Sequence, residues 1–447
     1  AWDCPHGGGE GWRAWIALVN PGAAPVEVRL TTSSGGGPPQ PSAETLDPSV
    51  LRYVEVPAPL PGSATAVESF GAEIAAGMVM AAPEGGIAAE PCTREAGTSW
   101  VISEASTLRG EEARLILHNP FAAEAVVDVT VVAGDRSLSP GRLQRLLLQP
   151  GEARAIDLHH YALGDDALGA SVEASVGRVA VSTVTVSNGG VRAALGVRGA
   201  APRWLLPGLG PRGDLVVRAP GSREVAFHAE LDGPEGARRV VDLEAVPAGI
   251  VEAFPVSDAI GGIVAEVDGP RSMVAGRRMS PAAPAPPPPD EKGGSGGKGG
   301  RGQGDGGGGA KDDGGATSGA AKGKGGKEAQ EEEAPQTTDV ASTSGALAGA
   351  PRWLALPALG PDGGEGTLLI QNPGTTPVDV RVSFLGTGGP VGEEQVVTVL
   401  PTSTAQVGLP EGGPVAALVD AGRGAVVAAQ AATSPSAFAV ALGVPID

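Results

Sequence analysis

The chain has 447 residues, a net charge of −19 and a pI near 4.7. This length exceeds what one hydrophobic core usually spans, so several domains are expected. The acidic balance argues against nucleic acid or an anionic membrane surface as partner, because both require clustered Lys and Arg, and no run of apolar residues is long enough to predict a membrane span.

A pattern of two alternating runs around a short turn occurs four times along the chain. The four copies read IALVNPGAAPVEVRL (16–30), LILHNPFAAEAVVDV (115–129), LVVRAPGSREVAFHA (215–229) and LLIQNPGTTPVDVRV (368–382). Apolar residues recur at every second position on both sides of the turn. This period predicts two strands with one buried face, joined as an antiparallel hairpin.

The turn residues have a physical reason to be there. Proline holds φ near −65° and favours extended geometry in the residue before it, so an Asn-Pro pair can end a strand and start a turn. The asparagine side chain can accept a hydrogen bond from the amide two residues on, which Ala219 in the third copy cannot do. The third turn is therefore predicted to be looser. The predicted structural turn residues are Asn20, Pro21, Asn119, Pro120, Asn372 and Pro373.

The fold predicted from these repeats is all-β, with tandem immunoglobulin-like or related antiparallel β-sandwich units. The units are placed at 1–97, 98–199, 200–280 and 349–447, the third being the shortest and most degraded. Trp100, Trp204 and Trp353 open the last three units and are predicted to plug their cores.

Residues 281–348 differ from the rest of the chain in composition. They run from PAAPAPPPP through a Gly-rich tract with the chain's six lysines to a Glu-rich end, with almost no large apolar residue. Such a Pro/Gly/Lys/Glu segment is predicted to be a disordered linker. It would tether the fourth unit to the first three.

The two cysteines, Cys4 and Cys92, lie near the two ends of the first unit. They are too few for a thiolate metal cage. We expect a disulfide that closes the first unit and implies an oxidising compartment; the alternative is two unrelated buried thiols. The chain starts with Ala1 rather than Met, which favours removal of an N-terminal export signal or anchor.

Two clusters are candidate sites. Trp2, Trp12 and Trp15 lie close to Cys4, and Trp15 is on the outward face of the first strand, so these aromatics could bind a glycan. Core packing with an N-terminal cover is the other interpretation.

His159 and His160 lie beside Asp157 and suggest a metal-binding loop, although their spacing lacks the i, i+4 pair of a helical zinc site. A polar surface loop is the alternative, and neither a metal site nor a cofactor is predicted. His118 occupies a strand position that we expect to face solvent.

The chain resembles a known family. AWDCP at the start, PC before a Trp-led second unit, the repeated strand and Asn-Pro turn, and a hydrophobic final strand are similar to actinobacterial envelope proteins of domain-of-unknown-function family 5719. The resemblance implies a protein at or beyond the cytoplasmic membrane, with no known activity and no catalytic residues to carry over.

These observations favour a non-enzymatic extracytoplasmic scaffold, spacer or adhesion protein, secreted or membrane-anchored at the cell envelope. No G-x-S-x-G elbow or P-loop is present, and the GxGxxG match at 302–307 has no flanking strand or helix. The partner would be an unknown protein or cell-wall component. The alternative is a cell-wall glycan-binding module that uses aromatics of the first unit, and the third possibility is an extracellular hydrolase.

Overall fold

The computed structural model describes residues 1–447 with the exception of 36, 84, 188–189, 211, 233–237, 258–260, 281–340, 435–436 and 447. The described residues form strands and two short 3-10 helices, η1 (Gly141–Leu143) and η2 (Leu158–His160). Residues 1–282 and 337–447 group into one compact unit, called the folded body below. The all-β prediction is confirmed.

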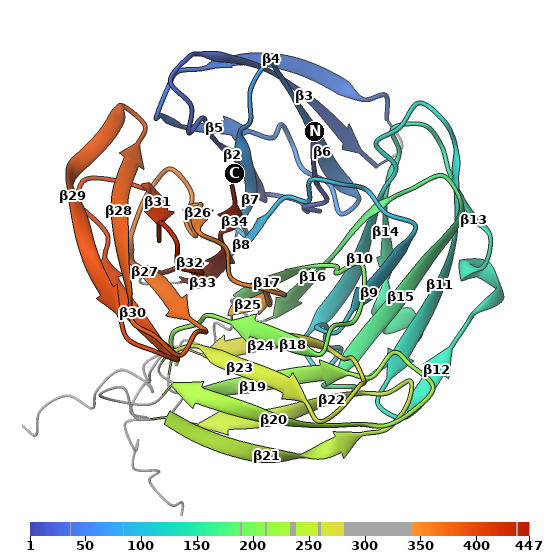
Figure 1. The fold of residues 1–447 in the computed structure, drawn as a ribbon. Coiled ribbons are helices and arrows are strands. Elements are labelled where there is room, and N and C mark those ends of the chain that lie inside the picture. Colours follow the sequence, from blue (N-terminus) through green and yellow to red (C-terminus); the bar gives the residue numbers. More distant parts are fainter. Residues whose placement is uncertain are drawn as a thin grey trace, which may run out of the picture. The chain divides into compact units, whose positions relative to one another are not determined.

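Eight antiparallel sheets pair into four sandwiches (Figure 1). In each sandwich the inner sheet contains the first strand of the repeated pattern and the last sandwich strand, not counting the two-residue β34 (Val444–Pro445), which belongs to the outer sheet of the fourth unit. The other sheet is the outer one. The inner sheets, in strand order, are β5 (Leu51–Glu55), β2 (Arg13–Val19), β7 (Ala75–Ala81), β8 (Ile87–Pro91); β14 (Ala153–Asp157), β10 (Glu112–His118), β16 (Ala180–Ser187), β17 (Gly190–Leu195); β22 (Val251–Ser257), β19 (Arg212–Arg218), β24 (Val274–Ser280), β25 (Ala341–Ser344); and β30 (Ser403–Gly408), β27 (Glu365–Asn372), β32 (Val427–Ser434), β33 (Ala437–Leu442).

The outer sheets complete the sandwiches. They are β1 (Trp2–Cys4), β6 (Ser63–Phe70), β3 (Val26–Ser34), β4 (Gln40–Leu46); β12 (Arg136–Leu138), β11 (Ala125–Ala133), β15 (Leu168–Val176), β9 (Ser99–Ile102), with β13 (Leu146–Leu148) also on β11; β18 (Arg203–Leu206), β23 (Ile263–Val267), β20 (Val225–Asp232), β21 (Arg238–Val246); and β29 (Gly389–Val399), β28 (Val378–Gly386), β31 (Ala416–Asp420), β26 (Arg352–Ala355), β34 (Val444–Pro445).

Both runs of the repeated pattern form strands, but the predicted hairpin is wrong. In the first unit β2 pairs with β5 and β7, whereas β3 pairs with β4 and β6. The Asn-Pro turn therefore carries the chain from the inner sheet to the outer sheet, and the same holds in the other three units. The two buried faces predicted from the period meet across the sandwich instead of lying side by side.

The cores of the last three sandwiches contain the predicted tryptophans. Trp100, Trp204 and Trp353 are buried, each in the core cluster of its own unit. The indole N–H of Trp100 donates to the carbonyl of Val179 at 2.7 Å, and that of Trp204 donates to Met273 at 2.7 Å. These tryptophans are core plugs, as predicted.

One central strand of each inner sheet is buried on both faces, whereas the edge strands β5, β14, β22 and β30 are partly exposed. Strands β7, β16, β24 and β32 are buried along nearly their whole length, while β3, β11 and β20 of the outer sheets alternate between buried and more exposed positions. The cause is contact between units. The last sandwich strands make a closed cycle in which β8 contacts β17, β17 contacts β25, β25 contacts β33 and β33 contacts β8 (Figure 1).

The third unit ends later than the predicted boundary. Ala341–Ser344, assigned from composition to the linker 281–348, form β25 and pair with β24 in the register Met279↔Ala341. The segment 281–340 therefore begins and ends in one hairpin of the third unit. It is an insertion and not a tether between units, because the fourth unit contacts the first and third directly. The prediction of disorder for 281–340 lies outside the described residues.

This arrangement predicts that the insertion is dispensable for folding. Replacing 281–340 by an Asn-Gly turn should leave the folded body intact, since β32 and β33 are joined across only 435–436 at the matching place in the fourth unit. Shortening the loop from about 60 residues to two lowers the entropy of closing it and should raise the free energy of unfolding by up to about 3 kcal/mol. Urea unfolding followed by Trp fluorescence measures the change, with a Gly/Ser insertion of equal length as control. A broad, non-cooperative unfolding transition of the shortened chain would contradict the prediction that the insertion is dispensable.

Candidate functional site

The asparagines of the repeated turns make the predicted bond and several more. The amide N–H of Gly22 donates to Oδ1 of Asn20 at 2.9 Å, as predicted for the residue two positions on. The side-chain Nδ2 of Asn20 also donates to the carbonyls of Ala24 at 2.8 Å and Leu46 at 3.0 Å. One buried amide thus ties the first strand to its turn and to the end of β4.

The other two copies repeat this network. Nδ2 of Asn119 donates to the carbonyls of Ala123 and Gln149, and Nδ2 of Asn372 donates to those of Thr376 and Leu400. The corresponding turn amides, those of Phe121 and Gly374, donate to Oδ1 at 3.2 and 2.9 Å. Ala219 has no side chain that can do so. Only its backbone is bonded, with its N–H donating to Ile250 at 3.1 Å and its carbonyl accepting from Gly249 at 2.7 Å.

A reciprocal substitution tests this role. Asn372→Ala removes the hydrogen bonds from Nδ2 to the carbonyls of Thr376, Val399 and Leu400 and the bond that Oδ1 accepts from the amide of Gly374, so we expect the free energy of unfolding to fall by about 1–3 kcal/mol. Ala219→Asn should leave stability unchanged or raise it, because that turn gains the missing bonds. Both variants are compared with the parent by urea unfolding. Equal loss in the two variants would show that the side-chain network is not what stabilises the turns.

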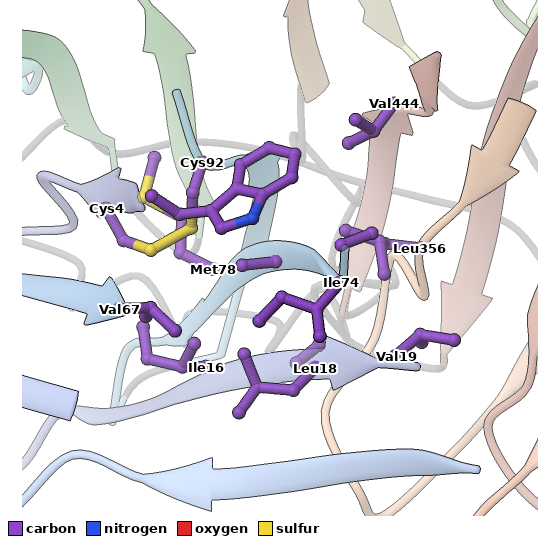
Figure 2. Packing of buried hydrophobic residues seen from close by; sticks show 14 of the residues in the cluster. Cys4, Ile16, Leu18, Val19, Val67, Ile74, Met78, Cys92, Leu356 and Val444 are labelled. Carbon is purple, nitrogen blue, oxygen red and sulfur yellow. A yellow bond between two sulfur atoms is a disulfide. The ribbon is translucent and has the colours of Figure 1, made fainter. Parts of the chain in front are cut away.

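The predicted disulfide is present. Cys4 in β1 and Cys92, just beyond β8, are bonded and buried, so that the outer and inner sheets of the first unit are covalently joined (Figure 2). The neighbouring residues Asp3 and Thr93 exchange backbone hydrogen bonds at 2.8 and 2.9 Å. Such bonds form and persist in oxidising compartments, so the disulfide indicates an extracytoplasmic location.

The three tryptophans of the first unit do not form one exposed surface. Trp15 faces outward from its own sandwich, but that face is covered by the fourth unit, where Trp15 packs with Leu359 and Ala439. Trp2 is buried as well, with the guanidinium of Arg94 over its ring at 4.8 Å. Trp12 is half-buried. Any glycan contact made by this region would have to use Trp12.

The two adjacent histidines lie in η2 and at the surface beside β14. Their rings stack with centroids 4.3 Å apart, and Nδ1 of His160 is 4.0 Å from Oδ2 of Asp157. Across the described residues, no group of three or more His, Cys, Asp or Glu is placed to hold a metal ion. The structure brings His159, His160 and Asp157 together without completing a ligand set.

The residue before each repeated turn joins one unit to the unit before it. His118, which we expected to face solvent, is buried with Nδ1 3.8 Å from Oδ1 of Asp3 in the first unit. At the same position Arg218 donates to the carbonyl of Ile102 in the second unit at 3.2 Å, and Gln371 donates to that of Ile263 in the third at 3.3 Å. In the first unit this position is Val19, which packs in one cluster with Leu356 and Val444 of the fourth unit (Figure 2). The first unit is thus joined to the fourth in the same way.

Burial between units changes the protonation of these groups. Burial lowers the pKa of His118 to about 3, and nearby His6 adds to the effect. Burial raises the pKa of Asp3 to about 7. The imidazole of His118 is therefore neutral at pH 7. The contact between the first two units is a polar packing contact and not an ion pair.

A buried ionic cluster joins the second and third units. Nε of Arg278 on β24 donates to Oε1 of Glu104 at 2.6 Å, and its Nη1 donates to Asp166 at 2.7 Å. Nε of Arg192 on β17 lies 3.6 Å from the same oxygen of Glu104, and Nη1 of Arg192 donates to Glu111 at 2.9 Å. Burial raises the pKa of Glu104, but Arg278 and Arg192 more than offset this, so the pKa lies below its usual value. Glu104 is ionised at neutral pH.

Sequence reasoning did not find this cluster, although one signal was available. The chain has no lysine outside 292–327, so its other basic side chains of this kind are all arginines. Arginine is the cation best suited to buried ion pairs. Arg277 and Arg278 also interrupt an otherwise apolar strand, VAGRRMS. Polar residues in such a strand indicate contacts beyond the sandwich.

One family model matches the chain. It is described as a family of unknown function, DUF5719, and it covers residues 50–286, which is more than half of the sequence. The chain belongs to this family. The DUF5719 match starts just before β5 and ends shortly after β24, so it covers most of the first three units and leaves the fourth outside.

Two further findings bear on identity. A search of curated proteins finds no match to the chain. In the part of the chain that the structure describes, no helix has the length and apolar character needed to cross a membrane.

Proposed function

We propose that this DUF5719 protein is a non-enzymatic scaffold, spacer or adhesion protein of the actinobacterial cell envelope, outside the cytoplasmic membrane. The disulfide supports the compartment, because it needs oxidising conditions. The fold supports a structural role, because four sandwiches are locked into one body by buried inter-unit bonds.

The observation that carries the proposal is the set of free sheet edges on the outer sheets. β4, β21 and β29 each end their sheet and pair on one side only. β29 spans eleven residues, and its Val396 is 67% exposed. An edge of this length presents unpaired backbone N–H and C=O groups, to which a partner can add an extended strand.

Sedimentation with envelope fractions tests the proposal. The full chain is mixed with intact actinobacterial envelopes, with protease-treated envelopes and with purified sacculi, as the parent and as the variants Val396→Asp and Trp12→Ala. Binding that is saturable, lost on protease treatment and weakened by Val396→Asp supports protein adhesion. Binding to bare sacculi that Trp12→Ala removes would favour the glycan-binding alternative. Failure to bind any fraction would contradict an adhesive role.

A further inference from the structure

The fourth unit contains a cavity of about 440 Å³ at one end of its sandwich. Its walls are mostly apolar and include Pro357, Leu359 and Leu409, while Glu365 and Glu411 stand at its exposed rim. None of the lining residues is Lys or Arg. The cavity therefore combines an apolar interior with uncompensated negative charge, which suits a cation that has an aliphatic stem.

A buried amide lines the cavity and leaves one acceptor free. Gln430 on β32 is 1% exposed. Its Nε2 donates to the carbonyls of Ala355 at 3.0 Å and Val415 at 2.9 Å. No group of the described residues donates to its Oε1. Oε1 is not among the fully buried atoms that lack a partner, so it is open to the cavity, and a ligand can donate an N–H to it in place of water.

The third unit has an arginine where the fourth has Gln430. Gln430 pairs with Leu368 and Arg277 pairs with Leu215, and these two leucines hold the same position in the repeated pattern. Nη1 of Arg277 donates to the carbonyl of Gly261 at 2.5 Å and lies 3.5 Å from that of Leu206.

The acceptors of the two side chains also correspond. The carbonyls of Leu206 and Ala355 each lie two residues after the tryptophan that opens the unit. Trp204 pairs with Ala265, and Trp353 pairs with Val419. The carbonyls of Gly261 and Val415 belong to the residues four positions before these two partners. Gln430 and Arg277 thus bond the same two backbone positions of their units.

The longer arginine reaches into space that is empty in the fourth unit. A Cβ at Gly208 would collide with the guanidinium of Arg277. The counterpart of Gly208 in the segment PRWLALPALGP is Ala358, which lines the cavity. Burial lowers the pKa of Arg277 to about 10, and the carboxylate of Asp232 opposes this shift. In the third unit the side chain of Arg277, itself an alkylguanidinium, therefore fills the space that is a cavity in the fourth unit, and the carboxylate of Asp232 is close enough to interact with it.

We infer that the cavity of the fourth unit binds an alkylguanidinium, either a free small molecule or an arginine side chain of a partner. The guanidinium donates to Oε1 of Gln430, the aliphatic stem packs between the proline and leucine walls, and Glu365 and Glu411 balance its charge. Both carboxylates are exposed to solvent, so their attraction for the ligand should weaken as the salt concentration rises. This site is independent of the scaffold role.

Calorimetry on the full chain tests the inference with agmatine, which is an alkylguanidinium without a carboxylate, at concentrations up to about 10 mM. We expect saturable binding with one site per chain that weakens as salt rises. 4-Aminobutylurea, which keeps the terminal ammonium of agmatine but has an uncharged urea in place of the guanidinium, should not bind. Nα-acetyl-arginine methylamide separates the two sources: binding as tight as agmatine favours a peptide arginine, and weaker binding favours a small free cation.

Variants locate the site. Gln430→Arg should abolish binding, because it fills the cavity as Arg277 does in the third unit. Glu411→Gln changes an exposed side chain that does not affect folding and should weaken binding by about tenfold, the loss of one charge-assisted contact. Glu393→Gln, at an exposed carboxylate of the same unit that does not line the cavity, is the matched control and should bind normally. No heat with agmatine, or undiminished binding in both Gln430→Arg and Glu411→Gln, would overturn the inference.

Discussion

Arg278→Ala should reduce the free energy of unfolding by about 3–5 kcal/mol, the usual cost of removing one partner from a buried ion pair. Arg278 and Glu104 have side chains that are only 4% and 2% exposed, and their bond joins the third unit to the second. Without Arg278, the carboxylate of Glu104 keeps only Arg192, at 3.6 Å, as a cationic neighbour. Urea unfolding at neutral pH measures the loss.

The pH dependence of this loss identifies its cause. In the parent the pKa of Glu104 is below its usual value of 4.5, so its ion pairs add stability above that pH and lose it as the pH falls through the lowered pKa. In the variant, burial acts with little opposition, so the pKa of Glu104 should rise and protonation should relieve the unpaired charge. The difference in the free energy of unfolding between parent and variant should therefore become smaller from pH 7 towards pH 4.5.

A surface pair is the control for this experiment. Arg29→Ala removes an ion pair with Glu68 whose two side chains are about half exposed, and we expect a change below about 1 kcal/mol. If the difference in the free energy of unfolding between the parent and Arg278→Ala stays constant across this pH range, lost packing and not the charge of Glu104 destabilises the variant.

The double variant Cys4→Ala/Cys92→Ala should lose about 4 kcal/mol of stability, since the bond closes a loop with a sequence separation of 88. The strand β1 pairs with β6 through three residues, and its other backbone pairing is the Asp3–Thr93 bridge next to the disulfide, so without the bond it should also fray. Urea unfolding gives the stability, and hydrogen exchange of the β1 amides reports the fraying. The parent treated with dithiothreitol is the matched control and should behave like the variant. A loss below about 1 kcal/mol would show that β1 is held by its noncovalent contacts.

The strands and their inward faces could be predicted because alternation is a local property. A run such as Val26–Leu30 places its apolar side chains on one face whatever the rest of the chain does, and Val26, Val28 and Leu30 are all buried. The hydrogen bonds to Asn Oδ1 were predictable for the same reason, since they follow from residue type and nearby sequence. The disulfide was predictable because the chain has only two cysteines, one near each end of the first unit. Strand pairing was not, because a period of two does not say which sheet a strand joins.

The solvent exposure predicted for His118 is wrong because another unit covers that face. Trp15 does face outward from its own sandwich, and the fourth unit covers it. The four serine, threonine and alanine residues Ala341–Ser344 were assigned to the linker because they include no large apolar side chain. They form a strand because Ser342 and Ser344 donate to the carbonyls of Ala193 and Leu195 at 3.0 and 2.6 Å.

The sequence by itself therefore determined the all-β class, the repeated units, the covalent link within the first unit and the membership suggested by its motifs. Only the tertiary structure decided how the units close on one another, which polar residues are buried between them, and which side chains line the cavity around Gln430. The physical reason is the range of the forces involved. Strand propensity and turn chemistry act over a few residues, whereas Arg278 and Glu104, 174 positions apart, meet only where the second and third sandwiches pack together.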